Sequence, residues 1–347
     1  MKLRFLLFFI FAISGLRAWT PGTSQSDAAE GFIVNTEDRR DVLAFYNTVY
    51  TASEGYQSRV AWDGDITTGA PGTTSVEFKE DVRRRINFYR ALVGLPADIV
   101  FDDVKSAKDQ EAALMFSKNE SISHFPPSGW DFYTANAAEA AGNSNIAYGK
   151  YGPGAIDGYI FDRGASNYSV GHRRWFLYSQ AQVMGTGDVP ATNGYPAANA
   201  VWVIGDFKSA PSPEFIAWPN AGFSPHTVMP DRWSLSYPDA NFSGATVTML
   251  RNGVPIGVTI VSNDDNGFGD NTLVWEPDSL PVSLSGDEVF SITVSNISGA
   301  GVPSSYEYSV TLFDPLDLGE SVAVSGTATP LISGADYTFN SIAQADA

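Results

Sequence analysis

The sequence predicts an α+β protein in which a domain of helices and a few strands precedes an all-β domain. Three observations support this fold class. Apolar residues recur at helical spacing in the first half of the chain, apolar and polar residues alternate beyond residue 231, and a proline-rich stretch at 209–230 separates the two regions. The length of 347 residues agrees with two domains, and the hydrophobic content of 44% is ample for packed cores.

Residues 1–18 have the layout of a secretory signal peptide. Two basic residues precede an apolar run from Phe5 to Ile13, and small residues then lead to Ala18. The run is too short to span a bilayer, so we expect cleavage after Ala18 and no stable membrane insertion afterwards. Leu16 is a poor residue near that bond, and a retained anchor is therefore the alternative. The expected location is secreted, either extracellular or periplasmic.

Three helices are predicted in the first part of the mature chain. Residues 19–76 form an extension with one short helix, because capping residues at 35–38 precede apolar positions at helical spacing. A stronger helix has its apolar positions over 82–93 and stops at Gly94. The third covers 103–118, where alanines raise the helix propensity.

Shorter elements are predicted further along this domain. The alanine-rich residues 136–143 indicate another helix, and Pro153 sits at the first-turn position of the next one. Residues 200–204 are a short, continuous apolar run, which is typical of a buried strand. Helices combined with a few strands indicate a layered domain.

Beyond residue 231 the pattern is that of short strands. Two alternating runs flank Asn252-Gly253, the strongest signal for a two-residue hairpin, and Pro255 directs its strand toward a sheet edge. Further strands are expected at 272–275, 289–294 and 306–313. Their even spacing favours a small sandwich of immunoglobulin-like or fibronectin-like type. The expected ranges are a linker at 209–230, the β-sandwich module at 231–316 and a tail at 317–347.

Composition excludes several classes of function. The chain has no cysteine, which rules out disulfides, thiolate ligands and cysteine nucleophiles. The formal net charge is −18, and removal of three basic residues with the signal makes it more negative, so nucleic acid is not expected as a partner. Serine-hydrolase elbows, His-Glu-x-x-His helices and Walker-type phosphate loops are missing, which disfavours the common hydrolase and nucleotide-binding families.

Two of the three histidines lie in short motifs. His124 belongs to the segment SHFPP and His172 to the segment GHRRW, and between them residues 144–149 read SNIAYG and 159–164 read YIFDRG. Imidazole is the side chain best suited to change protonation or to ligate metal near pH 7. The search for chemistry therefore starts at these histidines, although only a fold can bring them together.

In this order the motifs resemble the CAP superfamily, or SCP domain, which includes cysteine-rich secretory proteins, insect antigen 5 and plant pathogenesis-related 1. The resemblance covers roughly residues 77–208. It is closest to bacterial members, because the eukaryotic ones carry disulfides and this chain has no cysteine. The resemblance implies a three-layer α–β–α sandwich, an arrangement that periodicity alone does not predict.

The resemblance also implies a site. In CAP domains two histidines and two acidic residues face one cleft, and some members hold a divalent metal there. His124 and His172 match the histidines and Asp162 matches one acid, whereas Ser144 stands at the place of the other. This departure removes a hard anionic ligand and a general base together. Glu111 and Glu139 are the alternatives for the lost acid.

Two interpretations of these residues stay open. The trio His124, His172 and Asp162 is sufficient for a metal site of the zinc type with an open water position, and a divalent metal is the only cofactor expected. Alternatively, the histidines are hydrogen-bonded residues that brace loops. For Arg173 and Arg174 we expect a structural role, in which one pairs with an acid such as Asp162 and the other stacks on Trp175.

The favoured function is binding rather than catalysis. We expect a small molecule, lipid or peptide in a cleft lined by His124, Ser144, Asp162 and His172, with the β module docking to a surface or partner. The alternative is a metal-assisted, peptidase-like hydrolase in which the trio holds the ion and its water is the nucleophile. A third possibility is an adhesive protein that depends on 231–316. Residues 264–271 hint at calcium, but their spacing is not that of an EF-hand, and a polar turn is the simpler interpretation.

Overall fold

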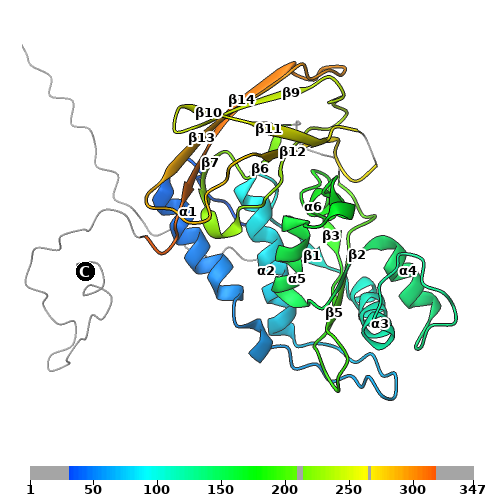
Figure 1. Ribbon diagram of the computed structural model, residues 1–347. Helices are drawn as coiled ribbons and strands as arrows, with labels where there is room; N and C mark the ends of the chain where they lie inside the picture. The colour runs from blue at the N-terminus through cyan, green and yellow to red at the C-terminus, as the bar shows by residue number, and fades with distance from the viewer. Residues whose placement is uncertain (1–30, 209–213, 265–266, 318–347) are drawn as a thin grey trace, which may run out of the picture.

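The computed structural model describes residues 31–208, 214–264 and 267–317. The expected signal peptide at 1–18, the first residues of the linker and the tail from residue 318 lie outside the described residues. Figure 1 shows a helical region that carries one small sheet and, above it, a region made of two larger sheets. The α+β prediction is confirmed at this level.

Four helices begin at residues whose side chains accept a hydrogen bond from a backbone N–H of the first turn. Such caps satisfy donors that have no partner within the helix, which explains why the local sequence predicts where these helices start. The caps are Asp38, Ser75, Asp102 and Thr134, and the helices are α1 (Arg39–Phe45), which continues as a π-helix (Tyr46–Tyr50), α2 (Val76–Leu92), α3 (Asp103–Asn119) and α4 (Ala135–Asn143).

The middle layer of the helical region is an antiparallel sheet with the strand order β2–β5–β4. Its strands are β2 (Ser144–Tyr148), β5 (Ala198–Trp202) and β4 (Gly187–Val189). Helices α3 and α4 cover one face, where Ala198 and Ala200 pack with alanines of both helices. Strand β2 pairs with β5 alone and is an edge of the sheet.

The other face of this sheet packs against α2 and α5 (Gly152–Phe161), so that the order of layers is helix, sheet, helix (Figure 1). Val201 of the sheet joins the apolar core that contains Val82 of α2 and Ile156 of α5. Helix α6 (Gly171–Phe176) follows α5 along the chain. A separate two-stranded parallel pair consists of β1 (Val100–Phe101) and β3 (Val183–Met184).

The second, upper region, called the β-rich region below, consists of two sheets that share one apolar core. Trp233 and Trp275 contribute to this core from one sheet, and Phe290 and Val310 contribute from the other. The first sheet has the order β11–β12–β8–β6 and the second β10–β9–β13–β14–β7. The strands are β6 (Ile216–Trp218), β7 (Gly222–Pro225), β8 (Trp233–Ser236), β9 (Thr246–Arg251), β10 (Val254–Ile256), β11 (Val258–Ser262), β12 (Thr272–Pro277), β13 (Glu288–Ser295) and β14 (Ser305–Phe313).

The hairpin predicted at Asn252-Gly253 is confirmed. Both residues have positive φ, +50° and +80°, and they join β9 to β10 with Arg251 opposite Val254. Positive φ at both central positions is what a two-residue hairpin of this twist requires. Strand β10, which contains Pro255, lies at the edge of its sheet as expected.

The expectation of a linker at 209–230 needs correction for its described residues. Strand β6 pairs with β8, and β7 runs parallel to β14, so this stretch belongs to both sheets. Its prolines are compatible with strands because β6 and β7 are edge strands, with Pro219 after the end of β6 and Pro225 as the last residue of β7. The proline content therefore hid two short strands.

Contacts across the two regions are extensive. Trp218 and Phe313 of the sheets belong to the same apolar core as α2 and α5, and the N–H of Phe223 donates to the carbonyl of Thr36. Helix α1 of the extension packs beside β7. Within the described ranges, no helix has the length and apolar character needed to cross a membrane.

Candidate functional site

His172 and Asp162 form a close pair where α5 ends and α6 begins. Asp162 caps the C-terminus of α5 in the left-handed conformation, with φ of +48°. Its Oδ1 lies 2.7 Å from Nδ1 of His172, and its Oδ2 accepts the backbone N–H of His172 at 3.0 Å. Since a carboxylate accepts, Nδ1 carries the proton and Nε2 of the neutral ring keeps its lone pair.

The pair combines a buried acid with an accessible base. The side chain of Asp162 is 1% exposed, whereas that of His172 is 25% exposed. A neutral ring held in this tautomer can accept a hydrogen bond or ligate a metal at Nε2. The carboxylate fixes the orientation of the imidazole.

His124 has the same tautomer by a different contact. Its Nδ1 lies 2.8 Å from the carbonyl oxygen of Ala141, which can only accept, so Nδ1 is the donor. The residue is exposed, in the loop between α3 and α4. Its Nε2 is therefore also the nitrogen available to a ligand.

Both histidines are anchored to one short stretch of chain. His124 bonds to Ala141, near the end of α4, and the carbonyl of His172 accepts from Nδ2 of Asn145, on β2. Asn145 is four positions after Ala141, so their Cα atoms lie at most about 14 Å apart. The segments that carry the two histidines are thus both bound to residues 141–145, at the start of the edge strand β2.

The expected metal-ligand trio fits this geometry poorly. Both oxygens of Asp162 accept hydrogen bonds from His172, so the carboxylate is placed to orient the imidazole rather than to ligate an ion itself. The described part of the chain contains no group of three or more His, Cys, Asp or Glu side chains that could hold a metal ion. We therefore assign no chemical step to a metal.

The two glutamates considered for the lost acid are engaged elsewhere. Glu111 accepts hydrogen bonds from Thr134 and Asn136, and Glu139 forms an ion pair with Lys108 at 2.8 Å. These contacts join α3 to α4. Both glutamates thus act as connectors between the two helices.

Ser144, which stands at the place of the lost acid, is hydrogen-bonded to the carboxyl of Asp109, a residue that the sequence pattern does not indicate. Its Oγ donates to Oδ1 of Asp109 at 2.7 Å, and the N–H of Trp202 donates to Oδ2 at 2.9 Å. Asp109 is fully buried, and burial raises its pKa to about 8, although the hydrogen bonds from Ser144 and Trp202 act to lower it. Its position on the face of α3 that also buries Ser106 and Gln110 was the available signal.

A second buried carboxyl, Asp188 on β4, is linked to the histidine pair. It accepts from the N–H of Gly152 at 2.6 Å and from Nδ2 of Asn199 at 2.7 Å, and burial raises its pKa to about 6. Asn199 accepts from the hydroxyl of Tyr159 at 2.8 Å, and the Tyr159 ring lies 5.3 Å from the His172 ring between centroids. Hydrogen bonds therefore connect the sheet to Tyr159, and the ring of Tyr159 packs against the imidazole.

The two arginines after His172 are structural, but with partners other than those expected. Arg173 donates to the carbonyl oxygens of Ile160 and Arg232 rather than to the carboxylate of Asp162. Arg174 lies over the ring of Phe268, 5.8 Å from its centroid, and not over Trp175. Burial lowers the pKa of the Arg173 guanidinium, and nearby Asp162 raises it.

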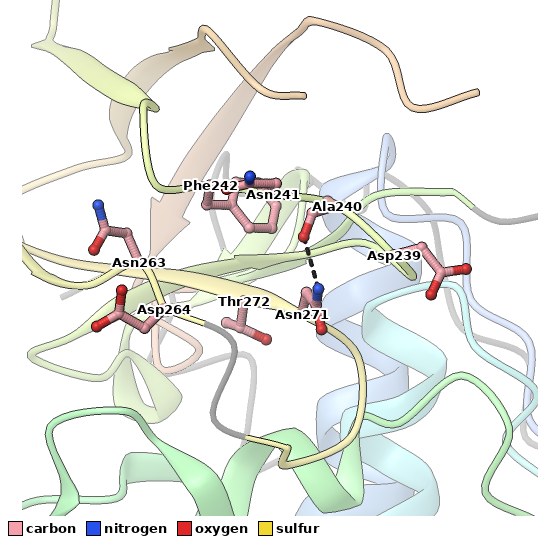
Figure 2. A pocket seen from close by; sticks show the side chains of 8 residues that line it. All are labelled: Asp239, Ala240, Asn241, Phe242, Asn263, Asp264, Asn271 and Thr272. Carbon is pink, nitrogen blue, oxygen red and sulfur yellow. Dashed lines mark hydrogen bonds between the residues drawn. The ribbon is translucent and has the colours of Figure 1, made fainter. Parts of the chain in front are cut away.

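A cavity of about 310 Å³ lies in the β-rich region, where the calcium hint was found. Figure 2 shows Asp239 and Asp264 at opposite ends of the cavity, and Asn271 donates to the carbonyl of Ala240 between them. Asp270 instead accepts from the N–H and hydroxyl of Ser179. The carboxylates diverge, which agrees with a polar turn. The lining residues are Asp239, Ala240, Asn241, Phe242, Asn263, Asp264, Asn271 and Thr272.

Comparison with known proteins gives one match. A family model described as CAP, the cysteine-rich secretory protein family, matches residues 83–207. The matched segment contains all four predicted site residues, His124, Ser144, Asp162 and His172. No curated protein and no solved structure matches the chain.

Proposed function

Because residues 83–207 form a domain of the CAP family, we propose that the chain is a secreted CAP-domain protein that binds a small molecule, lipid or peptide beside His172. The observation that carries this proposal is the pairing of a buried carboxylate with a partly exposed imidazole. A buried charge is costly unless it is paired, and this one orients a side chain toward solvent. Such an arrangement orients the His172 ring and leaves its Nε2 available to a ligand.

The surroundings of the histidines favour a ligand with both polar and apolar parts. Nε2 of a neutral ring accepts from a hydroxyl or amide, and the protonated ring donates to an anionic group. In the loop that carries His124, Phe125 is 89% exposed and Ile122 is 40% exposed. Peptides and polar lipids combine these features.

Secretion and the role of the second region complete the proposal. CAP proteins are commonly extracellular, and residues 1–18 have the layout of a cleaved signal. The apolar core shared by two sheets supports an immunoglobulin-like or fibronectin-like module over 231–316, which we propose docks to a surface or partner.

The test uses the purified mature chain with ¹⁵N-labelled histidine. Only three histidines are present, so single substitutions assign every signal. Three probes are titrated separately: phosphatidylcholine vesicles, an acetylated hexapeptide with mixed apolar and polar residues, and zinc chloride. We expect a saturable shift of the His172 signal with the vesicles or the peptide, and at least tenfold weaker binding in His172→Ala. His226→Ala is the matched control and should bind as the wild type does.

Two outcomes would change the proposal. If no probe moves the His172 signal, or if His172→Ala binds equally well, the site is not a binding site for these ligand classes. Stoichiometric zinc together with peptide hydrolysis, both lost in His172→Ala, would favour the metal-assisted hydrolase instead.

A further inference from the structure

We propose that Arg232, a residue of the β-rich region, is a positioning residue for the His172–Asp162 pair. This inference deepens the proposed function and rests on it for its purpose, but its geometry and its test involve no ligand. It gives the β-rich region a second role besides docking. That region would help to set the site in the CAP domain.

Arg232 holds the loop between α5 and α6 by its backbone. Its Nη1 donates to three carbonyl oxygens of that loop, those of Asp162 at 3.3 Å, Gly164 at 2.9 Å and Asn167 at 3.1 Å. Its Nε donates to Glu276 on β12 at 2.8 Å, and its side chain is 14% exposed. Glu276 of the sheet thus fixes the guanidinium, which in turn binds the backbone of Asp162, the residue whose carboxylate orients His172.

The loop needs such support, because backbone strain lies at both of its ends. Asp162 has φ of +48° and Val170 has φ of +47°, a conformation that is unfavourable for a β-branched residue. Strained residues persist only where the surrounding structure determines them. Nη1 of Arg232 supplies contacts at the start and the middle of this loop.

Helix α6 is also held by the β-rich region. It has six residues, too few to be stable without tertiary contacts. Arg173, 1% exposed, donates from Nη1 to the carbonyl of Arg232 at 2.9 Å and to Oγ of Ser234 at 3.0 Å, and Nη2 of Arg174 donates to the carbonyl of Asp270 at 3.0 Å. In Figure 1, α6 accordingly lies directly beneath the sheets. The helix that carries His172 is therefore seated on the second region.

The test compares Arg232→Met with Arg163→Met in the full mature chain. Methionine keeps an apolar stem and removes every donor. Arg163 lies on the same loop, but its side chain is 64% exposed and pairs with exposed Asp231 at 3.0 Å, so it is a matched control. The ¹⁵N spectrum of labelled histidine reports the tautomer of His172, and hydrogen exchange reports its Nδ1–H and backbone N–H.

In the wild type we expect His172 protonated at Nδ1, with slow exchange of both protons. Arg232→Met should mix the two tautomers and speed both exchanges at least tenfold, while the signals of His124 and His226 stay in place. Arg232→Lys should be intermediate, and Arg163→Met should match the wild type. Circular dichroism checks that each variant folds.

A folded Arg232→Met variant with unchanged His172 signals would overturn the proposal. If that variant does not fold, Glu276→Gln takes its place, because it loosens the guanidinium while leaving all carbonyl contacts possible. It should speed the same exchanges by a smaller factor, and no change there would also overturn the proposal. Failure of every ligand probe would leave these measurements valid, so the two proposals can fail separately.

Discussion

The CAP domain and the β-rich region are stabilised in different ways. The interior of the first contains fully buried charged side chains, including Arg85, Arg90, Asp109 and Asp188. The interior of the second is mainly aromatic and aliphatic, with Trp233 among its largest members, and most of its buried polar residues are uncharged, such as Ser234 and Thr272. Buried polar groups are costly unless each of them is satisfied, whereas apolar burial scales with area and has no partner requirement.

This difference explains where a binding site can be built. Polar networks fix side chains in single orientations, which a site needs and an apolar core does not supply. In the CAP domain, hydrogen bonds connect Asp188 through Asn199 to Tyr159, whose ring packs against His172. The comparison predicts that single substitutions in the CAP domain have large, pH-dependent effects on the free energy of unfolding. The effects of substitutions in the β-rich core should depend only on the size of the group removed.

The largest effect is expected for Arg85→Met. Arg85 is fully buried and forms ion pairs with Asp157 and Glu54, both at 2.5 Å. Its removal leaves Asp157 without its charge partner, and loss of one member of a buried pair costs about 3–5 kcal/mol. Urea denaturation should show this fall in the free energy of unfolding. The double variant with Asp157→Asn should lose less than the two single losses combined, and strict additivity would show that the pair does not act as one unit.

A pH-dependent effect is expected for Asp109→Asn. The folded pKa of Asp109, about 8, exceeds its usual 3.8, so between these pH values the folded state holds a proton that the unfolded state releases. The free energy of unfolding therefore falls as pH rises from about 4 to 8. Each pKa unit corresponds to about 1.4 kcal/mol. The asparagine variant cannot take up this proton, so its free energy of unfolding should depend less on pH. Parallel curves for the two proteins between pH 4 and 9 would contradict the prediction.

Much of the fold could be predicted because its signals are local. Caps such as Ser75 and the Asn252-Gly253 turn act within a few residues. Strands β6 and β7 are three and four residues long, and β7 pairs with β14, whose partner residues are 88 positions away, as for Gly222 and Val310. Such short strands form only because distant strands supply their hydrogen bonds, so the sequence nearby carries little of the information.

The site was predictable at the level of residues and not of contacts. The motifs singled out His172 and Asp162, but the bond between them depends on the left-handed backbone at Asp162 and on Arg232, 70 residues away. Asp109 is not indicated by hydrophobic periodicity, because it is a charged residue on the buried face of α3. The apolar Val104 of the same helix is 64% exposed, while Asp109 is buried. Polar residues on a buried face defeat a search based on hydrophobicity.

The smallest effect is expected for Ile292→Val in the β-rich core. Ile292 lies on β13 opposite Met249 of β9 and is 1% exposed. Loss of one buried methyl group costs about 1 kcal/mol, and it changes no charged group. The free energy of unfolding should therefore fall by the same amount at pH 5 and pH 8, unlike the response to Asp109→Asn. A loss that differs between the two pH values by as much as that of Asp109→Asn would show that the β-rich core is coupled to buried ionisable groups, and the contrast between the two regions would not hold.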